Sequence, residues 1–170
     1  MDCCTDKSNK EKKMGKTIWI IGIIALLAVG GFFLMGNRSN GYVALVSAGE
    51  VDFYKSGSCG CCGIHASYLQ RQGDLDVKIT EMQSISGIKQ KYGIPSELES
   101  CHTAIIGGYV VEGHMPLEVI DKLLIEKPDI KGIALPGMPL GSPGMPGAKK
   151  GEWIIYQLNN DGTYEEWMRY

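Results

Sequence analysis

The chain has 170 residues, with 17 Lys plus Arg against 19 Asp plus Glu and a formal net charge of −2. This balance gives no general basic surface, so the composition argues against nucleic acid as a partner. Apolar residues make up 44% of the chain and charged residues 21%, which is typical of a globular protein. Six Cys and eight Met exceed what packing requires at this length and direct attention to sulfur chemistry.

The N-terminal segment Thr17–Met35 is an uncharged apolar run, long enough to span a bilayer at about 1.5 Å per residue. Several lysines precede it, whereas Arg38 is the only basic residue that closely follows it. The positive-inside rule therefore predicts a cytoplasmic basic tail at residues 1–16 and a single transmembrane helix at 17–35, with the remainder in the periplasm. A cleaved signal peptide is the alternative, but the run is long for one and no small-x-small cleavage site is evident.

Further elements are predicted from apolar periodicity and turn residues. Residues 36–50 are a linker by composition, with a short apolar run at 42–46 that we expect to be a strand. In chain order we then expect a strand at 51–54, a helix at 64–72, a strand at 77–82, a short helix capped by Ser84, hairpin strands at 103–106 and 109–111, a helix at 117–126 opened by Pro116, and strands at 153–158 and 163–168. This order is typical of a thioredoxin-like α/β domain, which we assign to residues 51–170.

The run Cys59-Gly60-Cys61-Cys62 lies where the first strand of this domain turns into a helix. Backbone N–H groups at a helix start lower thiol pKa values, and thiolates are the ligands that select Cu(I), Zn and iron–sulfur clusters. Disulfides are the alternative. Disulfides alone fit poorly, because adjacent cysteines form a strained ring and three thiols within four residues leave one to pair with Cys101.

Other sulfur and nitrogen ligand candidates lie further along the chain. In a thioredoxin-like fold Cys101 faces the cysteine turn, and His102 and His114 are nitrogen candidates, each equally compatible with a hydrogen-bonded structural role. We expect His65, one turn past the cysteines, to tune thiol charge or to face solvent. The segment 136–146, PGMPLGSPGMP, contains too many Pro and Gly residues to form a helix or strand. The thioethers of Met138 and Met145 in this loop are candidate copper ligands, unless the loop buries them against the core.

Four motifs together resemble the bacterial CopG-type copper-resistance proteins, a family of metal-binding proteins. They are CGCC, P-x-x-L-x-SCHTA, GGY-x-x-EGH-x-P and GIALPGMP-x-GSPGM, which fall between residues 51 and 145. The resemblance implies a thioredoxin-like fold outside the cytoplasm, a multinuclear Cu(I) cluster held by thiolates, and a role in copper resistance. The metal ligands that it implies are Cys59, Cys61, Cys62 and Cys101, with His102, His114, Met115, Met138 and Met145 as lesser candidates.

Two functions follow from these observations. The first is a membrane-anchored protein that holds copper as Cu(I) in copper resistance or homeostasis, with copper ions, the membrane and a copper-transfer protein as partners. The second is a thiol–disulfide oxidoreductase that uses Cys59 and Cys62, although Cys61 would compete within that motif. A zinc site ranks third, because the run Cys-x-Cys-Cys does not give the two separate Cys-x-x-Cys pairs that are usual for zinc. No phosphate-binding loop, Ser/His/Asp arrangement or His-Glu-x-x-His motif supports another enzyme class.

Overall fold

The computed structural model describes residues 43–170. The predicted cytoplasmic tail, the transmembrane helix at 17–35 and most of the linker lie outside the described residues. Within residues 43–170, no helix is both long enough and apolar enough to cross a membrane.

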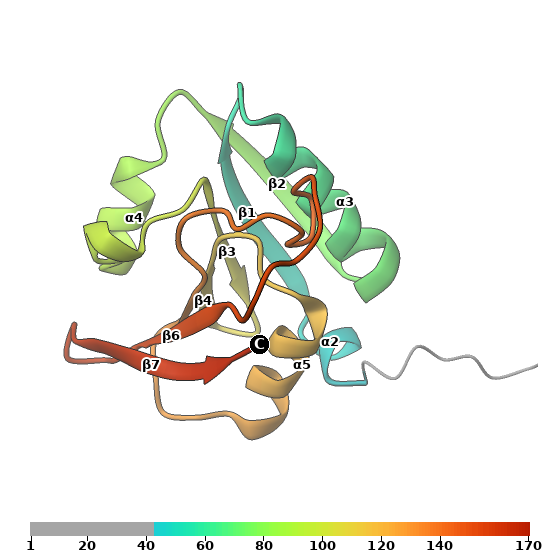
Figure 1. Ribbon diagram of the computed structural model, residues 1–170. Helices are drawn as coiled ribbons and strands as arrows, with labels where there is room; N and C mark the ends of the chain where they lie inside the picture. The colour runs from blue at the N-terminus through green and yellow to red at the C-terminus, as the bar shows by residue number, and fades with distance from the viewer. Residues whose placement is uncertain (1–42) are drawn as a thin grey trace, which may run out of the picture. The chain divides into compact units, whose positions relative to one another are not determined.

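A seven-stranded sheet organises the described residues (Figure 1). Its strands lie in the spatial order β2-β1-β3-β4-β5-β6-β7. The strand bounds are β1 Glu50–Ser56, β2 Asp76–Met82, β3 His102–Ile106, β4 Tyr109–Glu112, β5 Gly132–Ala134, β6 Ile154–Leu158 and β7 Tyr164–Arg169. The hairpin of β6 and β7 therefore forms the edge opposite β2.

The pairing directions follow from the connections between strands. β1 and β2 are parallel, which requires a crossover, and helix α3 (Gly60–Gly73) supplies it. β3 and β4 are antiparallel and joined by Gly107 and Gly108, both at positive φ, as a two-residue hairpin turn requires. β4 and β5 are again parallel, joined through helix α5 (Leu117–Glu126). β1 and β3 are antiparallel neighbours, which brings the start of β3 to the end of β1.

Apolar side chains form a separate core on each face of the sheet. The larger core joins α3 and α5 to one face. The smaller one packs Ile94 and Leu98, around the short 3₁₀ helix η1 (Ser96–Leu98), against the other. Successive residues of a strand point to opposite faces, so Val110 belongs to the smaller core and Val111 to the larger.

Most predicted elements are confirmed with bounds that differ by a few residues, and the α/β class is correct. The strand expected at 42–46 is wrong, because Val43–Val46 forms the short helix α2, which contacts α5 and fully buries Leu45. Ser84 is also not the N-cap of helix α4 (Ser86–Tyr92), since Ile85 holds that position. The Ser84 hydroxyl instead accepts a hydrogen bond from the Ser86 N–H at 3.3 Å. Strand β5 was not expected.

Candidate metal centre

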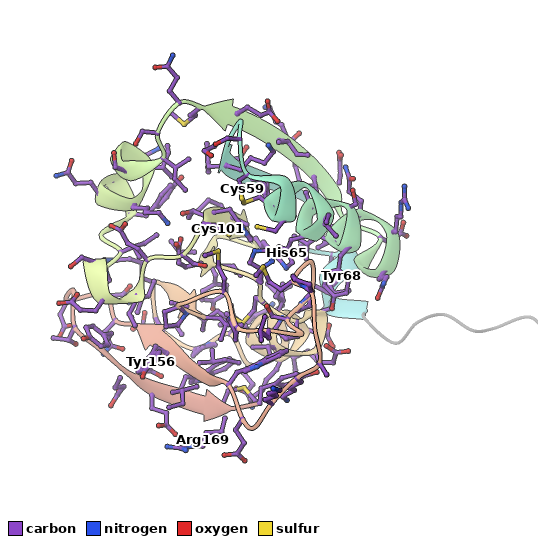
Figure 2. All side chains as sticks on the ribbon, turned by 45° about the horizontal axis from the view of Figure 1, so that its top comes forward. Cys59, His65, Tyr68, Cys101, Tyr156 and Arg169 are labelled. Carbon is purple, nitrogen blue, oxygen red and sulfur yellow. A yellow bond between two sulfur atoms is a disulfide. The ribbon has the colours of Figure 1, made fainter. Side chains whose placement is uncertain are left out.

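The end of β1 and the start of β3 bring two cysteine-bearing segments together. Cys59 is the N-cap of α3, and its backbone N–H donates to the Ser56 carbonyl at 3.1 Å. Cys101 directly precedes β3, where His102 pairs with Lys55 of β1. The antiparallel register therefore brings Cys101 to the end of β1, and Figure 2 shows the labelled Cys59 and Cys101 close together there.

The four cysteine sulfurs form one compact group. The Sγ atoms of Cys59, Cys61, Cys62 and Cys101 all lie within 4.8 Å of one another. Cys62 is buried and the other three are half-buried, so the group opens toward solvent on one side. The predicted convergence of these residues in space is therefore confirmed, whereas their role as metal ligands stays a prediction.

Two of these cysteines form a disulfide, Cys59–Cys62, which is the pair that the oxidoreductase alternative uses. The strained ring of adjacent cysteines does not arise, because the Cα atoms of Cys59 and Cys62 lie 5.4 Å apart, within the usual range for a disulfide. Cys61 and Cys101 are free thiols. The Cys59 and Cys61 sulfurs lie 3.5 Å apart.

A second group consists of three histidines behind the cysteines. His65, His102 and His114 are each no more than 1% exposed, and one ring nitrogen from each lies within 4.8 Å of the others. The solvent-facing position considered for His65 is thus wrong. The burial of His65 could have been predicted from its spacing in α3, because Cys62 and His65 are three residues apart and therefore share the buried face of that helix.

His114 connects the two groups. Its Nδ1 lies 2.7 Å from the Pro143 carbonyl, which is only an acceptor, so Nδ1 carries the proton and donates. In the neutral ring Nε2 then has a free lone pair, and it lies 3.0 Å from the Cys101 sulfur. The backbone carbonyl thereby orients the imidazole, as carbonyls commonly do for metal-binding histidines.

The loop at 136–146, free of helix and strand as predicted, lies against the start of α3. A Cβ added to Gly144, whose φ is +88°, would lie 3.0 Å from both the Cys61 carbonyl oxygen and the His65 nitrogen of the backbone. Met138 in the same loop is 40% exposed, and Met145 is half-buried. Met115 is fully buried. Metal binding by the three methionines stays a prediction.

A buried ion pair supports the turn that carries Cys101. The carboxylate of Glu112 accepts hydrogen bonds from the Lys89 ammonium, from the Ser100 backbone N–H and from the Thr103 hydroxyl. Lys89 and Glu112 are both buried. Sequence reasoning did not find this pair, although Glu112 belongs to the EGH motif.

Burial sets the protonation states at this centre. Desolvation lowers the pKa of His65 to about 3, and it also lowers the pKa values of His102 and His114, so all three rings are neutral at physiological pH. Burial, aided by the neighbouring Cys61 sulfur, raises the pKa of Cys101 to about 12. The imidazoles therefore need no deprotonation to bind a metal, whereas the Cys101 thiol must release a proton.

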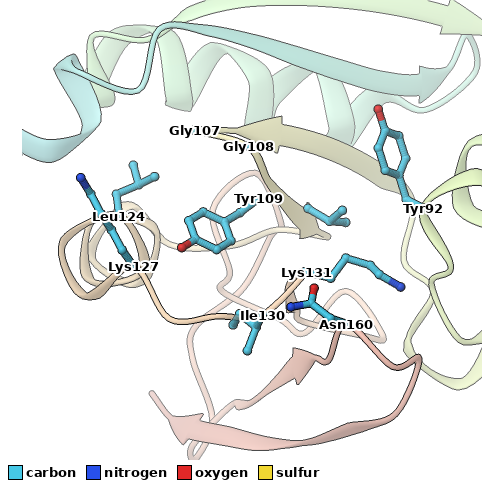
Figure 3. A pocket seen from close by; sticks show the side chains of 10 residues that line it. Tyr92, Gly107, Gly108, Tyr109, Leu124, Lys127, Ile130, Lys131 and Asn160 are labelled. Atoms are coloured by element: carbon cyan, nitrogen blue, oxygen red, sulfur yellow. The ribbon is translucent and has the colours of Figure 1, made fainter.

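One cleft of the described residues lies away from this centre (Figure 3). Tyr109, Lys131 and Asn160 are among its lining residues, which include no cysteine or histidine. It therefore takes no part in the candidate metal centre.

Comparisons with known proteins place this geometry in a family. The family described as "Protein of unknown function, DUF411" matches residues 98–145. Two solved structures, copper resistance protein copG form 1 and form 2, are each similar to this chain with 35% identity and a TM-score of 0.65. Form 1 matches over 72% of this chain and 98% of its own, and form 2 over 71% and 97%.

The chain belongs to the CopG-type copper-resistance family. The resemblance inferred from the four motifs is thus confirmed. No curated protein sequence matches the chain. The CopG match includes most of the described residues, and the DUF411 match contains Cys101, His102 and His114.

Proposed function

We propose that this CopG-type protein binds copper as Cu(I) on a thiolate cluster of Cys59, Cys61, Cys62 and Cys101. The observation that carries the proposal is the gathering of four sulfurs within 4.8 Å, although Cys101 is distant in sequence from the other three. Thiolates are soft ligands, and soft ligands favour Cu(I) over harder divalent ions. Membership of a family with copper-resistance proteins among its solved structures supports the same metal.

The cluster that we propose is multinuclear, because sulfurs this close can each bridge two cuprous ions. His102, His114 and the three methionines are the outer ligand candidates. Cys59 and Cys62 must first be released from their disulfide. A dithiol reductant supplies two electrons and two protons and itself becomes a disulfide; each released thiol then loses its proton when its sulfur binds copper.

The proposed setting is the outer side of a cytoplasmic membrane. Residues 17–35 anchor the protein by a single span, residues 51–170 form a thioredoxin-like domain in the periplasm, and a copper-transfer protein is a partner. The positive-inside pattern supports this orientation. The pairing of β1 with β2 around α3, followed by the β3–β4 hairpin and α5, supports the thioredoxin-like assignment.

The orientation of the protein in the membrane is tested on intact cells. The cells are treated with a reductant and a metal chelator and then labelled with a thiol reagent that does not cross membranes. Labelling of Cys61 in intact cells is expected. Labelling only after lysis would contradict the orientation.

The metal assignment is tested by loading the reduced full chain anaerobically with Cu(I), in competition with a cuprous chelator and with Zn²⁺. We expect more than one Cu(I) per chain and little displacement by Zn²⁺. A single tightly held Zn²⁺ with no retained Cu(I) would contradict the copper assignment.

A thiol–disulfide oxidoreductase is the second candidate function. The Cys59–Cys62 disulfide at the N-terminus of α3 favours it, because the pair occupies the position where a helix start activates a thiolate. Cys61 opposes it, since its free sulfur lies 3.5 Å from Cys59 and can attack the same disulfide.

A further inference from the structure

The loop that lies against the start of α3 keeps its shape through hydrogen bonds of its own. The Ser142 hydroxyl donates to the Pro139 carbonyl at 2.7 Å, and the Met145 N–H donates to the Ser142 carbonyl at 2.8 Å. At the base of the loop, the Gly141 N–H donates to the Pro146 carbonyl at 3.1 Å. A loop closed in this way is a compact unit, so a contact at its base also holds its tip.

The tip of this loop touches the candidate metal centre in two places. The Pro143 carbonyl accepts the hydrogen bond from His114 Nδ1, and Gly144 packs closely on the backbone of Cys61 and His65. If the tip moved away, the His114 imidazole would lose its acceptor, and the first turn of α3 would lose a neighbour. The loop therefore forms one wall of the candidate metal centre.

Lys149, which follows the loop, lies over two aromatic rings. Its Nζ atom is 4.7 Å from the centroid of the Trp153 ring and 4.3 Å from the centroid of the Tyr170 ring, both within the range of cation–π attraction. The two rings stack with their centroids 5.8 Å apart. The backbones of Trp153 and Tyr170 also exchange two N–H to carbonyl hydrogen bonds, at 2.9 and 3.0 Å, so the rings form a fixed platform for the ammonium group.

The backbone of Lys149 is packed against the base of the same loop. A Cβ added to Gly141 would lie 2.4 Å from the Lys149 backbone nitrogen, so the two backbones are in close contact. A cleft separates the loop from the start of α5, and Pro143, Lys149 and Tyr170 are among the residues that line it. Because the loop is not packed on the core along this cleft, the contact of Lys149 with the two rings carries much of the attachment there.

We propose that Lys149 is a positioning residue for the candidate metal centre. Its cation–π contact with Trp153 and Tyr170 holds the loop against the turn that carries Cys61, and this slows the release of Cu(I). The role in copper release rests on the proposed function, whereas the attachment of the loop is a property of the metal-free chain as well. Removal of the Lys149 charge raises the population of detached loop about fivefold, which corresponds to about 1 kcal/mol at about 1.4 kcal/mol per factor of ten.

The test compares three variants of the full chain. Lys149→Met keeps the apolar stem and removes the charge, and Lys149→Arg keeps a cation that can lie over the rings. Lys150→Met is the matched control, because Lys150 makes no cation–π contact among the described residues. Hydrogen exchange of the Gly141 and Met145 amides in the metal-free chain reports detachment of the loop. We expect exchange about fivefold faster in Lys149→Met and nearly unchanged in the other two variants.

The same variants are then loaded anaerobically with Cu(I), and the rate of transfer to a cuprous chelator is measured. Transfer should be about fivefold faster in Lys149→Met, and Lys149→Arg should restore the rate of the unsubstituted chain. Equal rates in Lys149→Met and Lys150→Met would overturn the proposal, and so would faster amide exchange in Lys149→Met with an unchanged rate of copper transfer. Absence of Cu(I) from the unsubstituted chain would overturn the proposed function and the copper-release role together, while faster amide exchange in Lys149→Met would still support the attachment of the loop.

Discussion

The end of the sheet that carries the candidate metal centre and the C-terminal hairpin of β6 and β7 use the same kinds of side chain in opposite environments. At the candidate metal centre, Glu112 and Lys89 form a buried ion pair, and Glu112 also accepts a hydrogen bond from the backbone beside Cys101. On the hairpin, Glu166 and Arg169 form a pair with hydrogen bonds of 2.7 and 3.0 Å that is exposed to water. Figure 2 shows Arg169 at the surface, far from Cys59 and Cys101.

The difference teaches that burial, and not the presence of charged or aromatic residues, distinguishes the functional end. The hairpin strand β7 is exposed along most of its length, so its polar residues cost little to keep. At the end of the sheet that carries the cysteines, His65, His102, His114 and Glu112 are desolvated, which costs free energy unless their polar atoms are hydrogen-bonded or paired. The expected effects of substitution therefore differ in size between the two regions.

The largest effect is expected from Glu112→Gln. This change leaves the buried Lys89 ammonium without its counter-charge, which costs about 3–5 kcal/mol of unfolding free energy. Glu166→Gln is the matched control on the hairpin and should change stability far less, because its partner is solvated. Urea unfolding of both variants checks this. Equal destabilisation by the two substitutions would contradict the contrast between the regions.

A smaller effect is expected from Gly144→Ala in the loop against α3. Gly144 has a φ of +88°, and a methyl group there would press on the backbone at Cys61 and His65. We expect a loss of about 1–3 kcal/mol and weaker copper retention. Gly137→Ala is the control, because Gly137 also has a positive φ, +77°, but has no atom within 4 Å of an added Cβ. If copper retention were weaker in Gly137→Ala and unchanged in Gly144→Ala, the result would contradict a role for this loop at the candidate metal centre.

The last effect concerns pH, and it is absent at neutral pH and develops only on acidification. In the folded metal-free protein the pKa of His65 is about 3, whereas an unfolded histidine titrates near 6.5. Between these values the unfolded chain binds the extra proton, so stability rises with pH and is lost as pH falls from about 6.5 toward 3. One such proton changes the unfolding free energy by about 1.4 kcal/mol per pH unit. Urea unfolding at several pH values should show a flatter profile for His65→Gln; an unchanged profile would show that His65 is not the group responsible.

Local signals were sufficient for much of the fold and for half of the site. Gly107-Gly108 predicted the β3–β4 hairpin, and Pro116 with the apolar periodicity after it predicted α5. The cysteine run predicted the sulfur group, because three of its members are neighbours in sequence. Only the resemblance to a fold brought Cys101 to that group, and the register of β1 with β3 accounts for it.

The features that could not be predicted depend on tertiary contacts. Val43–Val46 reads as a strand by composition but forms a helix that packs on α5. Strand β5 has only three residues, too few to show a period. His65 looks like an ordinary polar residue on a helix until the face shared with Cys62 is known to be buried. Lys89 and Glu112 are far apart in sequence, so no local pattern connects them.

The most direct test of copper binding by the thiolate cluster compares four single variants, Cys59→Ser, Cys61→Ser, Cys62→Ser and Cys101→Ser. For each full-length variant, Cu(I) per chain after anaerobic loading is measured beside the reduction of insulin disulfides. Copper binding by a shared cluster predicts a clear fall in Cu(I) per chain for Cys61→Ser and Cys101→Ser, since both are free thiols of the group. Unchanged Cu(I) loading in both variants, with insulin reduction lost only in Cys59→Ser and Cys62→Ser, would contradict the cluster and favour the oxidoreductase.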